Sequence, residues 1–169
     1  EEAVIRKGQV GIRMGSESDL STMNEAVKVL TEYGFRCEVR ILSAHRSPDD
    51  TAKFARRARE KGFSVIIAGA GGAAHLAGVV ASHTTLPVIG VPMETKELKG
   101  IDSLLSTIQM PSGVPVATVT IGKTGAKNAG ILALQILGVT DKTIAKKLKN
   151  LKRSLAENVR NKDRSCKSG

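Results

Sequence analysis

Residues 64–76 read Ser-Val-Ile-Ile-Ala-Gly-Ala-Gly-Gly-Ala-Ala-His-Leu, a short apolar run followed by a glycine-rich turn and the start of an apolar helix. An uninterrupted run of apolar, mostly β-branched residues is typical of a strand that a parallel sheet buries on both faces. The same succession of strand, turn and helix returns along the chain. The pattern predicts five strands, at residues 9–14, 37–42, 64–68, 87–91 and 114–119.

This alternation predicts an α/β fold, a three-layer αβα sandwich around a five-stranded parallel sheet with right-handed crossovers. Five strands favour the flavodoxin-like order 2-1-3-4-5, in which ligands bind beyond the carboxyl ends of strands one and three. A C-terminal amphipathic helix is expected over about 141–159, where apolar residues recur every three or four positions. We expect residues 1–160 to form a single domain and residues 161–169 to be a disordered basic tail.

The composition argues against nucleic-acid-binding, membrane-spanning and disulfide-rich classes of protein. Aromatic residues are only 2% of the chain, so Val, Ile, Leu and Ala must fill the core. Most of the net charge of +10 lies after residue 139, without stacking aromatic residues or a nucleic-acid module, so we expect a solvated helix and no nucleic acid partner. The sequence contains no run of about eighteen apolar residues, the length that a membrane-spanning helix needs, so no membrane partner is expected. Two cysteines, Cys37 and Cys166, favour a reducing cytoplasm over a disulfide framework.

The turn after the first strand reads Gly-Ser-Glu-Ser-Asp over residues 15–19. Ser18 or Asp19 can cap the following helix, and the free amides at a helix start can hold an anion. An acidic Asp19 should not touch a phosphate, but it can accept hydrogen bonds from ribose hydroxyls. An ordinary helix cap without a ligand is the simpler alternative.

The turn after the second strand reads Ser-Ala-His-Arg-Ser-Pro-Asp-Asp over residues 43–50. Ser47 is expected to cap the next helix with Pro48 at its first position, which places His45 and Arg46 at the ligand end of the sheet. Arg46 offers a planar fork of donors to a phosphate. His45 is the side chain best suited to transfer protons near neutral pH, although a loop histidine without a role stays possible at this point.

The turn after the third strand, residues 69–76, lets the backbone approach a ligand closely, and its amides can hold an anion. It also matches the dinucleotide fingerprint, with Glu94 about twenty residues further on, so a nucleotide-binding module without chemistry of its own is an alternative. The segment Gly122-Lys123-Thr124 resembles the end of a P-loop, but Ala117 stands where the required glycine would be. The sequence has no Cys/His cluster at metal-ligand spacing, so we expect acid–base chemistry without a metal.

Together, the three turns resemble the signatures of 5-(carboxyamino)imidazole ribonucleotide mutases, the small-subunit type of purine-biosynthetic carboxylase. The resemblance runs from about residue 9 to 160. It also includes further motifs at residues 87–92, 102–106, 109–111 and 128–129. It implies a homo-octamer that binds a phosphoribosyl imidazole and moves a carboxylate from its exocyclic amine to a ring carbon, without ATP, metal or organic cofactor.

The resemblance also implies roles for individual residues. His45 transfers the proton, Asp19 holds the ribose, and the phosphate is surrounded by Ser16, Ser18, Ser43 and Arg46. The pocket for the base and carboxylate is implied to comprise Ala70, Gly71, Gly72, Ala73, His75 and Leu76.

A related branch of the family carboxylates aminoimidazole ribonucleotide directly with carbon dioxide, and this reaction is the closest alternative. That branch has Lys in place of Arg46 and lacks the Gly-Gly-Ala-Ala-His run, so the sequence favours the mutase. Arg13 departs from the family, which has an apolar residue in this strand. A buried charge there is costly unless it is paired or lies at a subunit contact.

Overall fold

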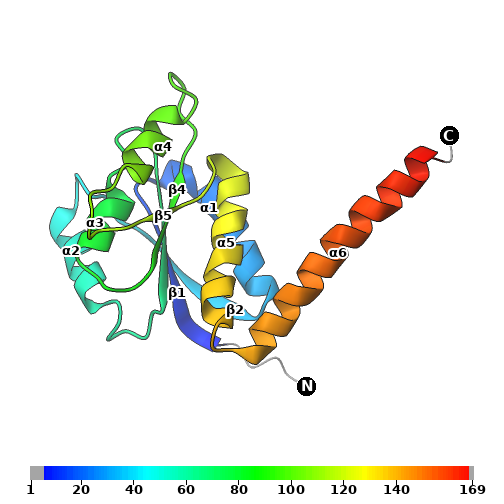
Figure 1. The fold of residues 1–169 in the computed structure, drawn as a ribbon. Coiled ribbons are helices and arrows are strands. Elements are labelled where there is room, and N and C mark those ends of the chain that lie inside the picture. Colours follow the sequence, from blue (N-terminus) through cyan, green and yellow to red (C-terminus); the bar gives the residue numbers. More distant parts are fainter. Residues whose placement is uncertain (1–5, 168–169) are drawn as a thin grey trace. The chain divides into compact units, whose positions relative to one another are not determined.

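The computed structural model describes residues 6–167 and contains one parallel sheet. Its strand order, β2-β1-β3-β4-β5, confirms the predicted flavodoxin-like order (Figure 1). The strands are β1 (Arg6–Met14), β2 (Phe35–Ile41), β3 (Val65–Ala70), β4 (Val88–Pro92) and β5 (Ala117–Thr118). Between the strands lie η1 (Glu17–Asp19), α1 (Leu20–Glu32), α2 (Pro48–Arg57), α3 (Leu76–Ser82) and α4 (Ile101–Ile108), and after β5 come α5 (Gly122–Gly138) and α6 (Lys142–Lys167).

Helices cover both faces of the sheet, as the apolar strands require. One face carries α1 and residues 122–133 of α5, which pack closely because Gly130 lies against Val29. The opposite face carries α2 and α3, and the core cluster between them and the sheet includes Phe54, Phe63 and Leu76 (Figure 1). Helix α4 packs against β4 and β5. Burial on both faces explains why β3 and β4 are apolar at nearly every position.

The fifth strand is shorter than the sequence predicted. A strand was expected over residues 114–119, but only Ala117 and Thr118 pair with β4. Pro115 has no amide to donate to the sheet, and Gly113 turns the chain with a φ of 91°. The apolar segment 114–119 is therefore longer than the part of it that pairs with β4.

The chain divides into two compact units, one up to Ala133 and one from Leu134. In the second unit α6 continues to Lys167, so residues 161–167 are helical where the sequence favoured a disordered tail. This segment contains neither Gly nor Pro, and the Ser165 hydroxyl donates to the Asn161 carbonyl at 3.0 Å. Within residues 6–167 no helix is both long and apolar enough to cross a membrane. The assignment of residues 1–160 to a single domain stays a prediction.

Arg13 is buried in β1, and its side chain is only 1% exposed. It donates to the carbonyl oxygens of Ile12 and Glu38, at 2.9 and 2.7 Å, and to the Glu38 carboxylate at 2.6 Å. Its guanidinium also lies 3.7 Å from the centre of the Phe54 ring. Burial lowers the pKa of Arg13 to about 10, although the Glu38 carboxylate opposes that shift. Glu38 is therefore the partner that the unusual charge requires.

Removing the counter-charge of Glu38 should destabilise the fold more than removing the buried charge of Arg13 itself. We expect Glu38→Gln to lower the free energy of unfolding by about 1–3 kcal/mol, because it leaves a buried guanidinium without its counter-charge. Arg13→Met, which fills the same space without a charge, should stay within about 1 kcal/mol of the parent chain. Urea unfolding measures both, with Glu97→Gln as a control on an exposed glutamate. A larger loss in Arg13→Met than in Glu38→Gln would contradict this account.

Candidate active site

A cavity of about 470 Å³ lies at the carboxyl ends of β1, β2 and β3, where the three predicted turns meet. Backbone hydrogen bonds continue from the strands into these turns. The Gly15 amide donates to the Gly69 carbonyl at 3.1 Å, and the Leu42 amide donates to the Met14 carbonyl at 2.9 Å. The turns are thus held side by side at the switch point of the sheet, the position expected for a ligand.

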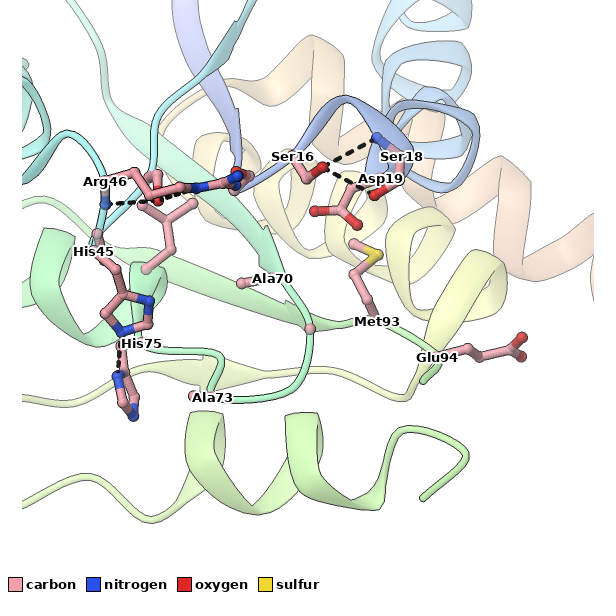
Figure 2. A pocket seen from close by; sticks show the side chains of 15 residues that line it. Ser16, Ser18, Asp19, His45, Arg46, Ala70, Ala73, His75, Met93 and Glu94 are labelled. Carbon is pink, nitrogen blue, oxygen red and sulfur yellow. Dashed lines mark hydrogen bonds between the residues drawn. The ribbon is translucent and has the colours of Figure 1, made fainter. Parts of the chain in front are cut away.

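The cavity brings together nearly all the residues that the sequence singled out. Its wall includes eleven of them: Ser16, Ser18, Asp19, Ser43, His45, Arg46, Ala70, Gly71, Ala73, His75 and Leu76. Gly72 belongs to the same turn but does not line the wall. Figure 2 shows the two histidines at one end, Ser16, Ser18 and Asp19 at the other, and the Arg46 side chain extending toward Ser16.

Four lining residues were not predicted as part of this site: Gly15, Ala44, Met93 and Glu94. Glu94 was considered only in the dinucleotide alternative. Met93 and Glu94 directly follow β4, and the Met93 amide donates to the Ala70 carbonyl at 2.9 Å. Extending the switch-point argument to the strand beside β3 would have indicated both.

At the serine end, Ser16 organises the start of η1. Its hydroxyl oxygen accepts hydrogen bonds from the Ser18 hydroxyl at 3.0 Å and from the Ser18 amide at 3.4 Å. Asp19 occupies the cap position of α1 but makes no side-chain capping bond. Burial raises the pKa of the Asp19 carboxyl, while hydrogen bonds to Ser16 and Ser18 oppose this shift. The end therefore offers hydroxyl groups and a half-buried carboxylate to a ligand.

Arg46 links the second turn to the first. Its Nη2 donates to the Gly15 carbonyl at 3.0 Å, and its backbone amide donates to the Ser43 hydroxyl at 3.1 Å. Ser47 stands at the cap position of α2, but its hydroxyl caps no α2 amide. It instead accepts from the Ser43 amide at 3.0 Å, which closes the turn. The exposed guanidinium is thus fixed beside Ser43 and Gly15 and keeps further N–H donors for an anion.

At the other end, His45 and His75 form a direct contact. The Nε2 atom of His45 lies 2.7 Å from Nδ1 of His75, and the two rings meet edge to face at 80°. This hydrogen bond requires a proton on one nitrogen and a lone pair on the other. A ligand therefore meets Nδ1 of His45 or replaces His75 as the partner of Nε2.

The glycine-rich turn is held from behind by two serines of α4. The Ser103 hydroxyl accepts from the Gly72 amide at 2.9 Å, and the Ser106 hydroxyl accepts from the Ala74 amide at 3.0 Å. Ser106 also donates to the Gly72 carbonyl at 3.0 Å. The expectation that the amides of this turn hold an anion is therefore wrong for Gly72 and Ala74, because serine hydroxyls already satisfy them.

Within the described part of the chain, no three His, Cys, Asp or Glu side chains are grouped so that they could hold a metal ion. The polar groups that the cavity itself offers are hydroxyls, two imidazoles, one guanidinium and the carboxylates of Asp19 and Glu94. Such a set of groups can bind a phosphate and a sugar, and an imidazole can transfer a proton to or from the bound molecule.

Comparison with known proteins identifies relatives over nearly the whole chain. A family model described as AIR carboxylase matches residues 9–158. A Thermotoga maritima protein named N5-carboxyaminoimidazole ribonucleotide mutase is 56% identical over 89% of this chain and 87% of its own length. The protein of the same name from Bacillus subtilis is 55% identical over 89% and 93%. The one from Pyrococcus horikoshii is 54% identical over 92% and 87%.

Solved structures show the same fold. The crystal structure of Treponema denticola PurE superposes with a TM-score of 0.84 and covers 95% of this chain and 98% of that chain. The two sequences are 28% identical.

Replacing Arg46 should weaken binding of a phosphorylated sugar. We expect Arg46→Ala to lower the affinity for ribose 5-phosphate by about tenfold to a hundredfold, because charge-assisted hydrogen bonds to the phosphate are lost. Isothermal titration measures the change. Arg56→Ala, an exposed arginine of α2 that does not line the cavity, is the matched control. Equal affinities for the two variants would show that the phosphate does not bind beside Arg46.

Proposed function

The chain belongs to the AIR carboxylase family, and we propose that it isomerises 5-(carboxyamino)imidazole ribonucleotide to 5-aminoimidazole ribonucleotide 4-carboxylate in purine biosynthesis. The relatives that carry the mutase name match nearly the full chain. The observation that carries the proposal is the cavity itself, in which an arginine with serine hydroxyls and a histidine pair occupy opposite ends.

The cavity suits a phosphoribosyl imidazole in one orientation. The phosphate binds beside Arg46, Ser16, Ser18 and Ser43, and the ribose hydroxyls donate to the Asp19 carboxylate. The imidazole base then extends toward His45 and His75, between the backbone of residues 70–73 and Leu76. Its exocyclic carboxylate and its ring carbon C4 both lie within the part of the cavity that His45 borders.

The first half of the reaction is a decarboxylation. Protonated His45 donates its proton to the exocyclic nitrogen, and the bond from this nitrogen to the carboxylate carbon breaks. Free carbon dioxide and aminoimidazole ribonucleotide result, with His45 now neutral. A carbamate-type carboxylate leaves readily once its nitrogen is protonated, so no further activation is required.

The second half returns the same carbon to the ring. Ring carbon C4 attacks carbon dioxide, a carbon–carbon bond forms, and neutral His45 removes the C4 proton, which restores the histidinium. Retention of carbon dioxide beside C4 is essential, because its escape would end the cycle. The Gly/Ala turn, held by Ser103 and Ser106, forms a close-fitting wall for this purpose.

Direct carboxylation of aminoimidazole ribonucleotide by carbon dioxide is the closest alternative, since it is the second of the two reaction steps described above. Arg46 and the Gly-Gly-Ala-Ala-His run favour the mutase. Turnover of the carboxyamino substrate without ATP or added bicarbonate distinguishes the two. A dinucleotide-binding role is disfavoured, because the glycine-rich turn follows β3 rather than β1 and α4 serines satisfy two of its amides.

The proposal includes a homo-octamer, as the family resemblance implies, and a location in the cytoplasm, which the two cysteines favour. Exposed apolar side chains support an assembly: Ile101, Leu105 and Ile108 of α4 are each about half exposed, at 52%, 53% and 51%. They recur at helical spacing and form one stripe, a feature more typical of a subunit contact than of a solvated helix.

Substitution of His45 tests the proton transfer. His45→Asn should lower kcat by a factor of about 10²–10⁴ and leave ribose 5-phosphate affinity within about twofold, because the phosphate binds at the opposite end. A spectroscopic assay with the carboxyamino substrate measures turnover. His83→Asn, a histidine outside this cavity, is the control. Near-normal turnover of His45→Asn would refute the assigned role.

Substitution of Ser106 tests the retention of carbon dioxide. Ser106→Ala removes the hydroxyl that joins Ala74 to Gly72, so the wall loosens. We expect escape of carbon dioxide to rise about threefold or more, in keeping with loss of one or two hydrogen bonds. Substrate with a ¹³C-labelled carboxylate reports escape as labelled bicarbonate by NMR. Ser82→Ala is the control, because the Ser82 hydroxyl donates to the Val79 carbonyl of its own helix and does not touch the glycine-rich turn in the described structure. Slower turnover without label in solution would make Ser106 a purely structural residue.

A further inference from the structure

A second cavity, of about 360 Å³, lies between the edge strand β2 and helix α2. Five basic side chains line it: Arg13, Arg40, Lys53, Arg57 and Lys61. Only two acidic ones do, Glu38 and Asp50. We call this cavity the basic groove. The catalytic proposal uses none of these residues.

Packing alone does not explain the arginine at the base of the groove. Arg13 is 1% exposed, and its Nε atom has no hydrogen-bond partner among the described residues. Glu38, its acidic partner among the described residues, is 46% exposed and therefore partly screened by water. An apolar side chain would fill the same space between Phe54 and β2 without the cost of burying a charge. What Arg13 adds is a fixed positive charge behind the groove.

The other basic residues increase this charge instead of neutralising it. Arg40 is the neighbour of Arg13 across the β1–β2 ladder, on the same face of the sheet. Lys53 and Arg57 are four residues apart on α2, a spacing at which like charges repel, and Lys61 lies in the turn after the helix. No ion pair between described residues involves any of these four. The two walls thus present unneutralised cations to one another across a cavity.

We propose that the basic groove is a second binding site, for a small multivalent phosphate anion of the size of pyrophosphate or tripolyphosphate. Five positive and two negative side chains leave a net charge of +3 on the wall. Guanidinium groups on both walls can each give two parallel hydrogen bonds to phosphate oxygens, and the lysines supply point charges. The cavity volume leaves room for two or three phosphate groups.

The groove and the active-site cavity share one loop. Leu42 and Ser47 line the groove, whereas Ser43, His45 and Arg46 line the active-site cavity. An anion in the groove therefore binds directly behind the segment that carries His45. The second site does not depend on the reaction proposed for the first, since it rests on the charges of β1, β2 and α2.

Titration with tripolyphosphate tests the proposal. The whole chain carrying Arg46→Ala is used throughout, so that phosphate binding in the active-site cavity is weakened about tenfold or more, at a constant ionic strength of about 0.1 M. Into this background Arg57→Gln and Arg56→Gln are introduced separately. The two arginines are adjacent on α2 and both are exposed, but only Arg57 lines the groove. Each variant loses one arginine, so the two have the same net charge.

We expect one tripolyphosphate per chain, an affinity lowered about tenfold or more by Arg57→Gln, and an affinity within about twofold of the background for Arg56→Gln. Arg13→Met should also weaken binding about tenfold while its circular dichroism spectrum stays unchanged, which separates loss of the site from loss of the fold. Equal weakening by Arg57→Gln and Arg56→Gln, or no saturable binding to the background chain, would overturn the proposal and leave only diffuse attraction to a basic surface.

Discussion

The functional architecture depends on hydrogen bonds that continue past the ends of parallel strands. Gly15 bonds to Gly69 beyond the end of β1, and Leu42 bonds to Met14 beyond the end of β2. Because parallel strands all end at the same edge, these bonds bring three turns from distant parts of the sequence against one another. The first turn contributes hydroxyls and a carboxylate, and the second contributes a hydroxyl, an imidazole and a guanidinium. The third contributes a backbone wall and the imidazole of His75. A cavity with serine hydroxyls and Asp19 at one end and a histidine pair at the other follows from this arrangement.

Much of this could be predicted from the sequence, because the deciding signals are local. Apolar strands, Ser47-Pro48 at a helix start and the glycine run after β3 each lie within a few residues. The strand order and the assembly of the three turns followed from them. The shortness of β5 was missed because an apolar pattern reports burial, whereas pairing needs amides that Pro115 lacks. The serines behind the glycine run were missed because they lie on another helix, about thirty residues away.

Arg13 shows how one departure from a family pattern changes a surface outside the active-site cavity. Within β1 its charge requires Glu38, and its guanidinium takes an apolar position against Phe54. Seen from β2 and α2, the same charge forms the base of a groove that four further basic residues surround. Sequence reasoning recognised the cost of the charge but could not show which side chains faced it. That answer depends on the register between β1 and β2, which pairs Arg13 with Arg40.

The contacts between α4 and the glycine-rich turn also affect when the site can form during folding. The hydrogen bond from Gly72 to Ser103 spans 31 residues, and the one from Ala74 to Ser106 spans 32. Closing a loop of this length costs conformational entropy before any contact repays it. The Gly72 and Ala74 amides gain these partners only once α4 lies against the turn. During synthesis, a chain released only as far as β4 contains His45 and the glycine-rich turn but not yet the two serines that hold this turn from behind.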